Sequence, residues 1–204
     1  VLSERRADLI VGSLIKNPGG GIAECGGYLA GRRDLVELCS YRLTSPGEGG
    51  EIGATLGQNK PMYKGFFFAP HIVAQALKTA HFAAYIFSHL GFETEPAWDK
   101  PHADIIQVVR CGSPEIMVAF CRGLQMGSPV DSFVSCEPCQ TPGYSDPVVM
   151  AAGAFTQGSS LELSADGPIR APYLIYFQGG LTYESGKVGI LSAARAVLRA
   201  RGEA

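Results

Sequence analysis

Residues 7–21 read ADLIVGSLIKNPGGG, an apolar segment that ends in a lysine and runs into three glycines. The apolar positions of Ala7–Ile15 are continuous rather than alternating, which predicts a strand buried on both faces. Pro18 and the glycines that follow it cannot continue a strand or a helix, so they predict a loop whose backbone comes close to another group. Lys16 therefore stands at the junction of strand and loop.

Strand and helix patterns alternate along the rest of the chain, which predicts an α/β or α+β fold. The expected strands are Gly27–Gly31, Asp104–Arg110, Val148–Thr156, Ser160–Ser164 and Tyr173–Phe177. The expected helices are Asp34–Leu43, Ala69–Gly91, Pro114–Met126 with Ser113 as its N-cap, and Tyr183–Arg201. The helix at Ala69–Gly91 is long enough to join two domains, so we expect a domain boundary near it.

The composition excludes several classes of protein. Of 204 residues 46% are hydrophobic and 18% are charged, so the chain can bury a core. A net charge of -2 without a run of Lys or Arg gives no footprint for nucleic acid or an anionic membrane surface, so a small molecule is the expected ligand. No apolar run approaches the roughly 20 residues of a membrane-spanning helix, and the N-terminus lacks signal-peptide form, which predicts a soluble, cytoplasmic protein.

The cysteines and histidines predict no metal site. Six cysteines are scattered along a chain too large to need disulfides, so we expect free thiols. The one CxxC, Cys136 to Cys139, lies in a proline-rich loop without a second pair, unlike a zinc ribbon. His71 and His81 are ten residues apart on the expected helix, which is not the i, i+3 or i, i+4 spacing of a metal pair.

Lys16 carries the strongest chemical signal in the sequence. A lysine that forms an imine needs a rigid element at the edge of a pocket and surroundings that keep its amine nucleophilic. Ser13 could give a hydroxyl to a phosphate, and the glycine loop offers backbone amides nearby. The pattern is not a Walker A loop, because Lys16 precedes the glycines and Asn17 follows it. On these residues alone, a solvated lysine beside a tight turn is an equal alternative.

The segment at residues 7–31 resembles the lysine region of fold-type I enzymes that use pyridoxal 5'-phosphate (PLP), with Ser-x-x-Lys at a strand end and an aspartate, Asp8, eight residues before the lysine. Five stretches resemble one family of these enzymes, the methionine gamma-lyase-like or aluminium-resistance proteins. They are SLIKNPGGGIAECGGYLAGR, GATLGQNKPMYKGFFFAPH, GSPVDSF, AAGAFTQGSSLELSADGPIRAPY and QGGLTYE. The similarity runs from Ala7 to about Val197.

The resemblance implies roles for particular residues. Lys16 is the implied catalytic and cofactor-binding residue, Ser13 a phosphate contact, and Arg170 the group that binds the substrate carboxylate through its planar fork. A surface or interdomain ion pair, with Asp166 for example, is the alternative for Arg170. The region after the second glycine-rich stretch approaches the partner's cofactor in many fold-type I dimers, and its candidates for such contacts are Gln58, Lys60 and Tyr63.

The resemblance also implies a domain plan. Residues 1–68 would be the C-terminal remainder of a large PLP-binding domain, residues 69–91 an interdomain helix, and residues 92–204 a small α/β C-terminal domain. The carboxylate that pairs with the pyridine nitrogen in this class lies well upstream of the lysine, but only fifteen residues precede Lys16. The chain also opens at Val1 without a methionine. It is therefore expected to be a fragment with an incomplete PLP site and an unpaired sheet edge.

The functional prediction follows from that plan. The intact parent would be a PLP-dependent lyase acting on sulfur-containing amino acids, forming a homo-dimer or tetramer, and this chain would be inactive alone. One alternative is a non-catalytic remnant that serves as an interaction or dimerisation module. A weaker one is an α/β protein that binds an anion through Lys16 without covalent chemistry. The fold alone does not choose among them.

Overall fold

The computed structural model describes residues 7–53 and 55–203 and confirms a mixed α/β class. The chain divides into two compact units, Val1–Ala69 and Pro70–Ala204. No helix within the described ranges combines the length and the apolar composition that crossing a membrane requires.

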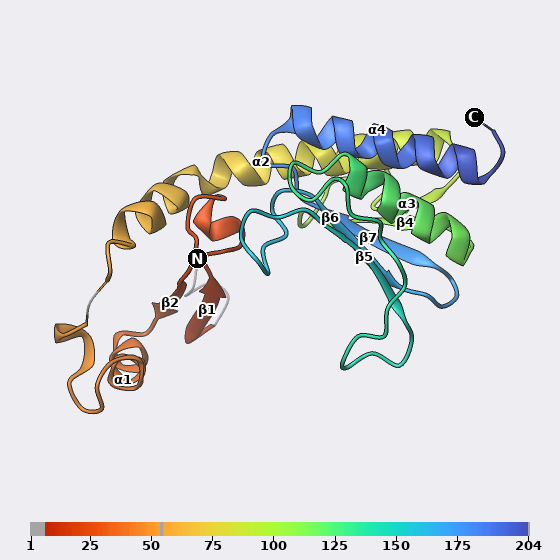
Figure 1. Cartoon of the computed structure of the whole chain (residues 1–204). Helices are drawn as coiled ribbons and strands as arrows, with labels where there is room; N and C mark the ends of the chain where they lie inside the picture. The colour runs from red at the N-terminus through yellow and green to blue at the C-terminus, as the bar shows by residue number, and fades with distance from the viewer. Residues whose placement is uncertain (1–6, 54, 204) are drawn as a thin grey trace. The chain divides into compact units, whose positions relative to one another are not determined.

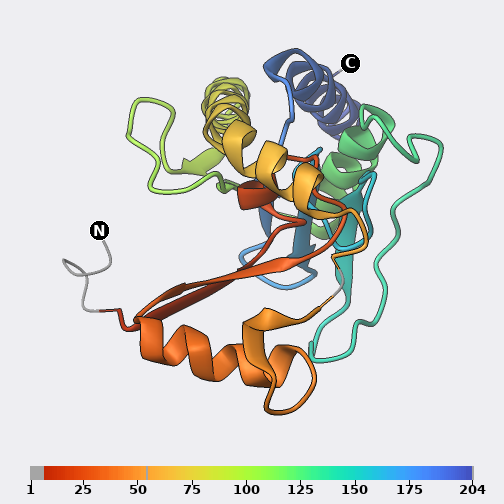
Figure 2. The ribbon, with the colours of Figure 1, turned by 90° about the vertical axis from the view of Figure 1, so that its left-hand side faces the viewer.

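The first unit is built on a β-hairpin. Strand β1 (Leu9–Ser13) pairs antiparallel with β2 (Gly27–Gly31), with Ser13 opposite Gly27. The glycine loop between them contains a short 3-10 helix, η1 (Asn17–Gly19), and β2 leads into helix α1 (Arg33–Leu43) (Figure 2). A second 3-10 helix, η2 (Gly49–Glu51), lies in the next glycine-rich stretch. The hairpin places both ends of the glycine loop side by side.

The prediction that this strand is buried on both faces is wrong. Val11 is 66% exposed and Ile10 38% exposed, because β1 has β2 as its partner in a two-stranded sheet and does not lie inside a parallel one. Among the described residues of this unit, the buried hydrophobic side chains are Leu14 and Ala23. The continuous apolar run therefore predicts the strand correctly here but not its burial.

Helix α2 (Asn59–His89) starts ten residues before the predicted Ala69. Pro70 lies inside this helix. Because proline has no backbone N–H, it cannot donate the hydrogen bond to the carbonyl four residues earlier, yet the helix continues. The helix ends at His89, two residues before the predicted Gly91. Gly91 has φ +84°, and the amides of Gly91 and Phe92 donate to the carbonyls of Ser88 and Phe87, which is a Schellman motif.

Two glycines bring α2 against the glycine loop in the first unit. A Cβ added at Gly65 would lie 2.0 Å from the carbonyl oxygen of Gly19, and one added at Gly20 would lie 2.3 Å from the carbonyl oxygen of Gly65. Backbone approaches backbone here, so side chains have no room. The group that the loop was predicted to approach is therefore α2.

The second unit contains a five-stranded antiparallel sheet in the order β3-β4-β7-β6-β5 (Figure 1). Its strands are β3 (Glu93–Glu95), β4 (Gln107–Arg110), β5 (Val148–Ala152), β6 (Ser164–Pro168) and β7 (Leu174–Gln178). The prediction of a strand at Ser160–Ser164 is wrong by four residues, and β3 was not predicted. The turn-like sequence Asp166-Gly167-Pro168 ends β6, where Pro168 lies opposite Val148.

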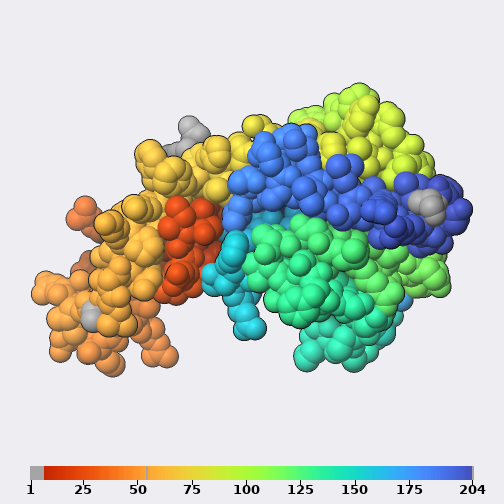
Figure 3. Space-filling model, turned by 45° about the horizontal axis from the view of Figure 1, so that its top comes forward, coloured from red at the N-terminus to blue at the C-terminus, as the bar shows by residue number. Residues whose placement is uncertain are grey.

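Three helices contribute to the core of the second unit: α2, α3 (Pro114–Met126) and α4 (Tyr183–Ala200). One face of the sheet contributes to this core through Val149, Ile175 and Phe177, whereas Tyr176 on the other face is 42% exposed. Helices α3 and α4 lie side by side (Figure 3). Each has a side-chain N-cap, Ser113 and Thr182.

Candidate functional site

The structure places Ser13 and Lys16 together at the end of β1. Ser13 is the last residue of the strand and is half-buried, and Lys16 is exposed in extended backbone just before η1. The hydroxyl oxygen of Ser13 accepts a hydrogen bond from the amide of Ile15 at 3.3 Å, which leaves the hydroxyl proton for another acceptor. The amine of Lys16 and the hydroxyl of Ser13 thus both lie near the end of β1.

The glycine loop does not offer the amides that the sequence predicted at Gly19 and Gly20. Both residues are buried, and their amides donate to the carbonyls of Lys16 (2.8 Å) and Asn17 (2.9 Å). The carbonyl of Gly19 in turn accepts the amides of Ile22 and Ala23. The prediction that the loop offers exposed backbone amides is therefore wrong for Gly19 and Gly20, because their amides make hydrogen bonds within the loop.

Asn17 has a polar atom that the loop leaves unused. Its Oδ1 is buried and accepts no hydrogen bond within residues 7–53 and 55–203. A buried acceptor without a donor carries a desolvation cost that a bound group can remove. The sequence did not reveal this residue as part of a site, since an Asn followed by Pro is typical of an ordinary turn.

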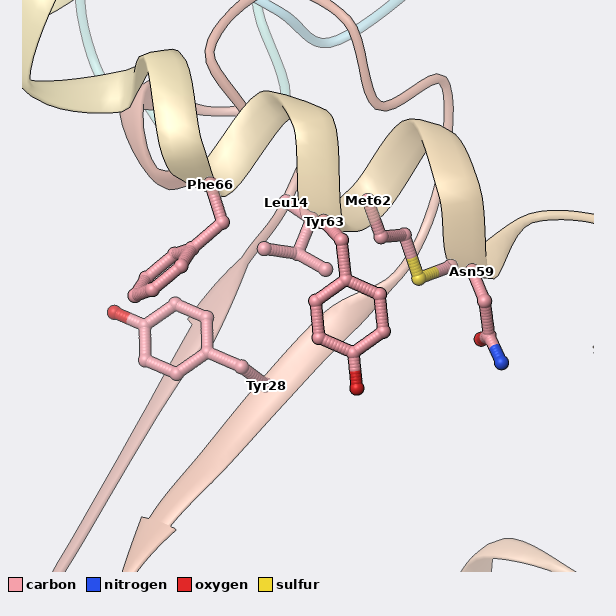
Figure 4. A pocket seen from close by; sticks show the side chains of 6 residues that line it. All are labelled: Leu14, Tyr28, Asn59, Met62, Tyr63 and Phe66. Carbon is pink, nitrogen blue, oxygen red and sulfur yellow. The ribbon is translucent and has the colours of Figure 1, made fainter.

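A pocket of about 230 Å³ lies between the hairpin and the first turns of α2 (Figure 4). Tyr28 of β2 and Leu14, just after β1, line it from the hairpin, and four residues line it from α2: Asn59, Met62, Tyr63 and Phe66. Tyr28 lies over Gly12, where an added Cβ would come within 2.4 Å of the ring. The signal that could have revealed the pocket is Gly12, a glycine in the middle of an apolar strand.

The three predicted cross-subunit residues lie at or just before the start of α2. Tyr63 lines the pocket and is 75% exposed. Lys60 is exposed. Gln58 is half-buried, and its backbone amide donates to the carbonyl of Thr55. The structure thus brings Tyr63 into one pocket with Leu14, two residues before Lys16.

Arg170 lies in the second unit, in the turn between β6 and β7. Its Nη1 is 3.5 Å from Oδ2 of Asp146, so its ionic partner is Asp146 and not the Asp166 considered from the sequence. It lines a pocket of about 400 Å³ with Tyr176 and the apolar residues of the turn. Burial raises the pKa of the Asp166 carboxyl. The Arg170 side chain is 63% exposed, so a second carboxylate can approach it.

The cysteines are free thiols, as the sequence predicted. Burial raises the pKa of Cys111 to about 12 and that of Cys121 well above its ordinary range, so both are unreactive. In the CxxC, Cys136 is buried and Cys139 is exposed. Within the described ranges no group of three or more His, Cys, Asp or Glu side chains could hold a metal ion.

A family model described as methionine gamma-lyase matches residues 3–198. The chain belongs to the methionine gamma-lyase family. This confirms the resemblance found in the sequence. YnbB of Bacillus subtilis (strain 168), an uncharacterized protein, is 53% identical over 193 residues, which are 95% of this chain and 46% of that protein. An uncharacterized 33.9 kDa protein of Lactobacillus delbrueckii subsp. bulgaricus is 48% identical, over 94% of this chain and 62% of its own.

Solved structures of this family superpose closely on the chain. A carbon-sulfur lyase involved in aluminum resistance from Clostridium novyi NT has a TM-score of 0.87 and 55% identity, covering 95% of this chain and 45% of that one. A candidate cystathionine beta-lyase involved in aluminum resistance from Listeria monocytogenes has a TM-score of 0.91 and 53% identity, covering 96% and 48%. The chain spans about half the length of these solved chains and of YnbB.

Proposed function

We propose that this chain is part of a PLP-dependent lyase that acts on sulfur-containing amino acids by removing the Cα proton and expelling a β- or γ-substituent. The observation that carries the proposal is the pairing of Lys16 and Ser13 at one strand end, in a chain of this family. Fold-type I architecture and the domain plan of residues 1–68, 69–91 and 92–204 belong to the same proposal. The cofactor would be pyridoxal 5'-phosphate.

The residues at this strand end fit such a cofactor in three respects. Lys16 offers an exposed amine for covalent attachment, and Ser13 keeps a hydroxyl proton that can be donated to a phosphate oxygen. Asn17 presents a buried acceptor that has no donor among the described residues. Asp8 is not proposed as the partner of the pyridine nitrogen, because its position eight residues before Lys16 matches the strand aspartate of this class; its Oδ1 lies 3.2 Å from Nη1 of Arg32. A bound PLP supplies an electron sink for the charge left on Cα.

Lys16 and Arg170 would divide the work on the substrate. The amine Nζ of Lys16 would take the proton from Cα and return one to the product. Arg170 would hold the substrate carboxylate through two parallel N–H bonds. Its present pair with Asp146 is solvent-exposed, and such pairs contribute little stability, so exchanging one carboxylate for another costs little.

We also propose that the intact enzyme is a homo-oligomer, a dimer or tetramer. The start of α2, with Gln58, Lys60 and Tyr63, would approach the partner subunit's cofactor. Exposure of the Lys60 and Tyr63 side chains supports this role.

A second candidate function is a non-catalytic interaction or dimerisation module. It is favoured by one observation: the main core cluster lies entirely within the second unit, from Ala83 to Val197. A unit with its own core can persist as a folded module without the chemistry of Lys16.

A spectroscopic titration separates the two candidates. The purified chain is mixed with PLP and the imine absorbance is recorded for wild type and for Lys16→Ala, Ser13→Ala and Lys78→Ala. We expect the band to vanish in Lys16→Ala, to need more PLP in Ser13→Ala, and to persist in the control Lys78→Ala, because Lys78 is an exposed lysine of α2 outside the proposed site. A band of equal size in Lys16→Ala would contradict the role of Lys16 and favour the module.

A further inference from the structure

Two histidine rings from distant parts of the sequence meet in the second unit. His81 lies on α2 and His102 lies in the connection between β3 and β4, and their ring centroids are 4.1 Å apart at an interplanar angle of 60°. Both side chains are half-buried. Neither residue belongs to the site around Lys16 or Arg170.

The hydrogen bonds around His102 determine which of its nitrogens carries the proton. The amide nitrogen of Gln107 donates to the carbonyls of Pro96 (2.9 Å) and Val108 (3.1 Å), so its oxygen faces the other way. That oxygen lies 2.8 Å from Nε2 of His102, and because it can only accept, Nε2 must be the donor. In the neutral ring Nδ1 then carries the lone pair. This Nδ1 is buried and has no partner in the part of the chain that the structure describes.

The same reasoning applies to His81. Its Nδ1 lies 3.3 Å from the backbone carbonyl oxygen of Trp98, which can only accept, so Nδ1 carries the proton. The lone pair of the neutral ring is therefore on Nε2. Each of the two rings donates through one nitrogen and carries a lone pair on the other.

Metal-binding histidines have this arrangement, because a donor bond from the second nitrogen to a carbonyl or carboxylate fixes the ring and its tautomer. We propose that Nε2 of His81 and Nδ1 of His102 together bind one divalent transition-metal ion, with water in the remaining positions. Imidazole ligands suit Zn²⁺, Ni²⁺ and Cu²⁺. At Zn–N distances of about 2.0–2.1 Å and a tetrahedral angle, two nitrogens lie about 3.3 Å apart and their ring centroids about 5 Å apart. The two half-buried rings, whose centroids are 4.1 Å apart, would therefore move apart by about 1 Å when the ion binds.

The site would join the β3–β4 connection to α2. The connection already packs there through Trp98, whose ring is 5.6 Å from Tyr85 and 6.5 Å from His89, centroid to centroid. A metal ion would add a second link between the β3–β4 connection and α2, through His102 and His81. Because the ion binds the folded chain, it stabilises that chain by mass action.

The test is calorimetric titration of the metal-free chain with Zn²⁺, without PLP. We expect one saturable site whose affinity falls as the pH is lowered, since protons compete for both lone pairs. Both His81→Gln and His102→Gln should weaken binding by at least about tenfold. In His102→Gln the new amide can still donate to Gln107, so the fold is kept while the ligand is lost. His71→Gln, on the exposed part of α2, is the matched control and should bind as wild type.

Thiols are the competing ligands, and Co²⁺ distinguishes them. Bound Co²⁺ should give a spectrum without a thiolate charge-transfer band, because imidazole and water are the ligands. The proposal is overturned if wild type binds no Zn²⁺, if His102→Gln binds as tightly as wild type, or if the Co²⁺ complex has a thiolate band.

Discussion

Gly65→Ala tests the contact between α2 and the glycine loop. An alanine at an ordinary position inside a helix stabilises it by about 1 kcal/mol relative to glycine. Here the added Cβ would lie 2.0 Å from the carbonyl oxygen of Gly19, whereas ordinary contact begins at 3.4 Å, so the loop and helix must separate by about 1.4 Å. Overpacking of this kind costs about 1–3 kcal/mol, and because both neighbours are backbone we expect the upper part of that range and a net loss of about 1–2 kcal/mol.

Urea unfolding measures the change in the free energy of unfolding, and amide hydrogen exchange locates it. Exchange should accelerate at Gly19, Gly20 and the first turns of α2. Gly50→Ala is the control, because Gly50 has an ordinary φ and no neighbour within 4 Å of an added Cβ, so its stability should not fall. If Gly65→Ala is as stable as wild type, or more stable, the close approach of the two backbones is refuted.

Three further changes probe single interactions. Ser113→Ala removes the oxygen that accepts the Ile116 amide at 3.4 Å, and urea unfolding should show a loss of about 0.5–2 kcal/mol; an unchanged midpoint argues against the cap. Asp166→Asn should raise Tm at neutral pH, since burial disfavours the ionised carboxyl and its raised pKa destabilises the fold once the group is ionised. That advantage should fade as the pH falls through the raised pKa and should be gone below the ordinary value of 3.8, and a difference in Tm that does not depend on pH contradicts it. Cys111, with its pKa raised to about 12, should resist alkylation in the folded chain while the exposed Cys139 reacts, as mass mapping can show. The protonated thiol of Cys111 contributes fully to stability below pH 9.0, the ordinary thiol value, and this contribution is lost as the pH rises toward 12. If Cys111 in the folded chain is alkylated as fast as Cys139, its burial is contradicted.

The elements that were predicted most accurately begin or end at residues that favour the end of a helix or strand. Helix α3 has the predicted bounds because Ser113 and Pro114 mark its start, and β2 has them because a glycine stands at each end. Helix α2 was predicted to start ten residues too late because Pro70 reads as a start signal, although a proline inside a long helix removes one hydrogen bond and leaves the remainder. Burial of β1 could not be predicted, since it depends on which strands pair and not on the apolar run itself.

In the candidate site too, local features could be predicted from the sequence and contacts made by the fold could not. Lys16 and Ser13 were found because their spacing is local, and their position at one strand end follows from the strand. The partner of Arg170 could not be found locally, because Asp146 is brought to it by the fold and not by the chain order. The pairing of His81 with His102 is of the same kind. Spacing along the sequence relates only histidines of one helix, whereas these two lie on different elements.

Lys16 is the residue proposed to hold the cofactor. Borohydride reduction of the chain mixed with PLP, followed by peptide mapping, tests it most directly, because the six lysines then compete for one label. If Lys16 holds the cofactor, the label lies on Lys16 and is lost in Lys16→Ala. A label spread evenly over the six lysines, or found mainly on Lys60 or Lys64, would contradict it.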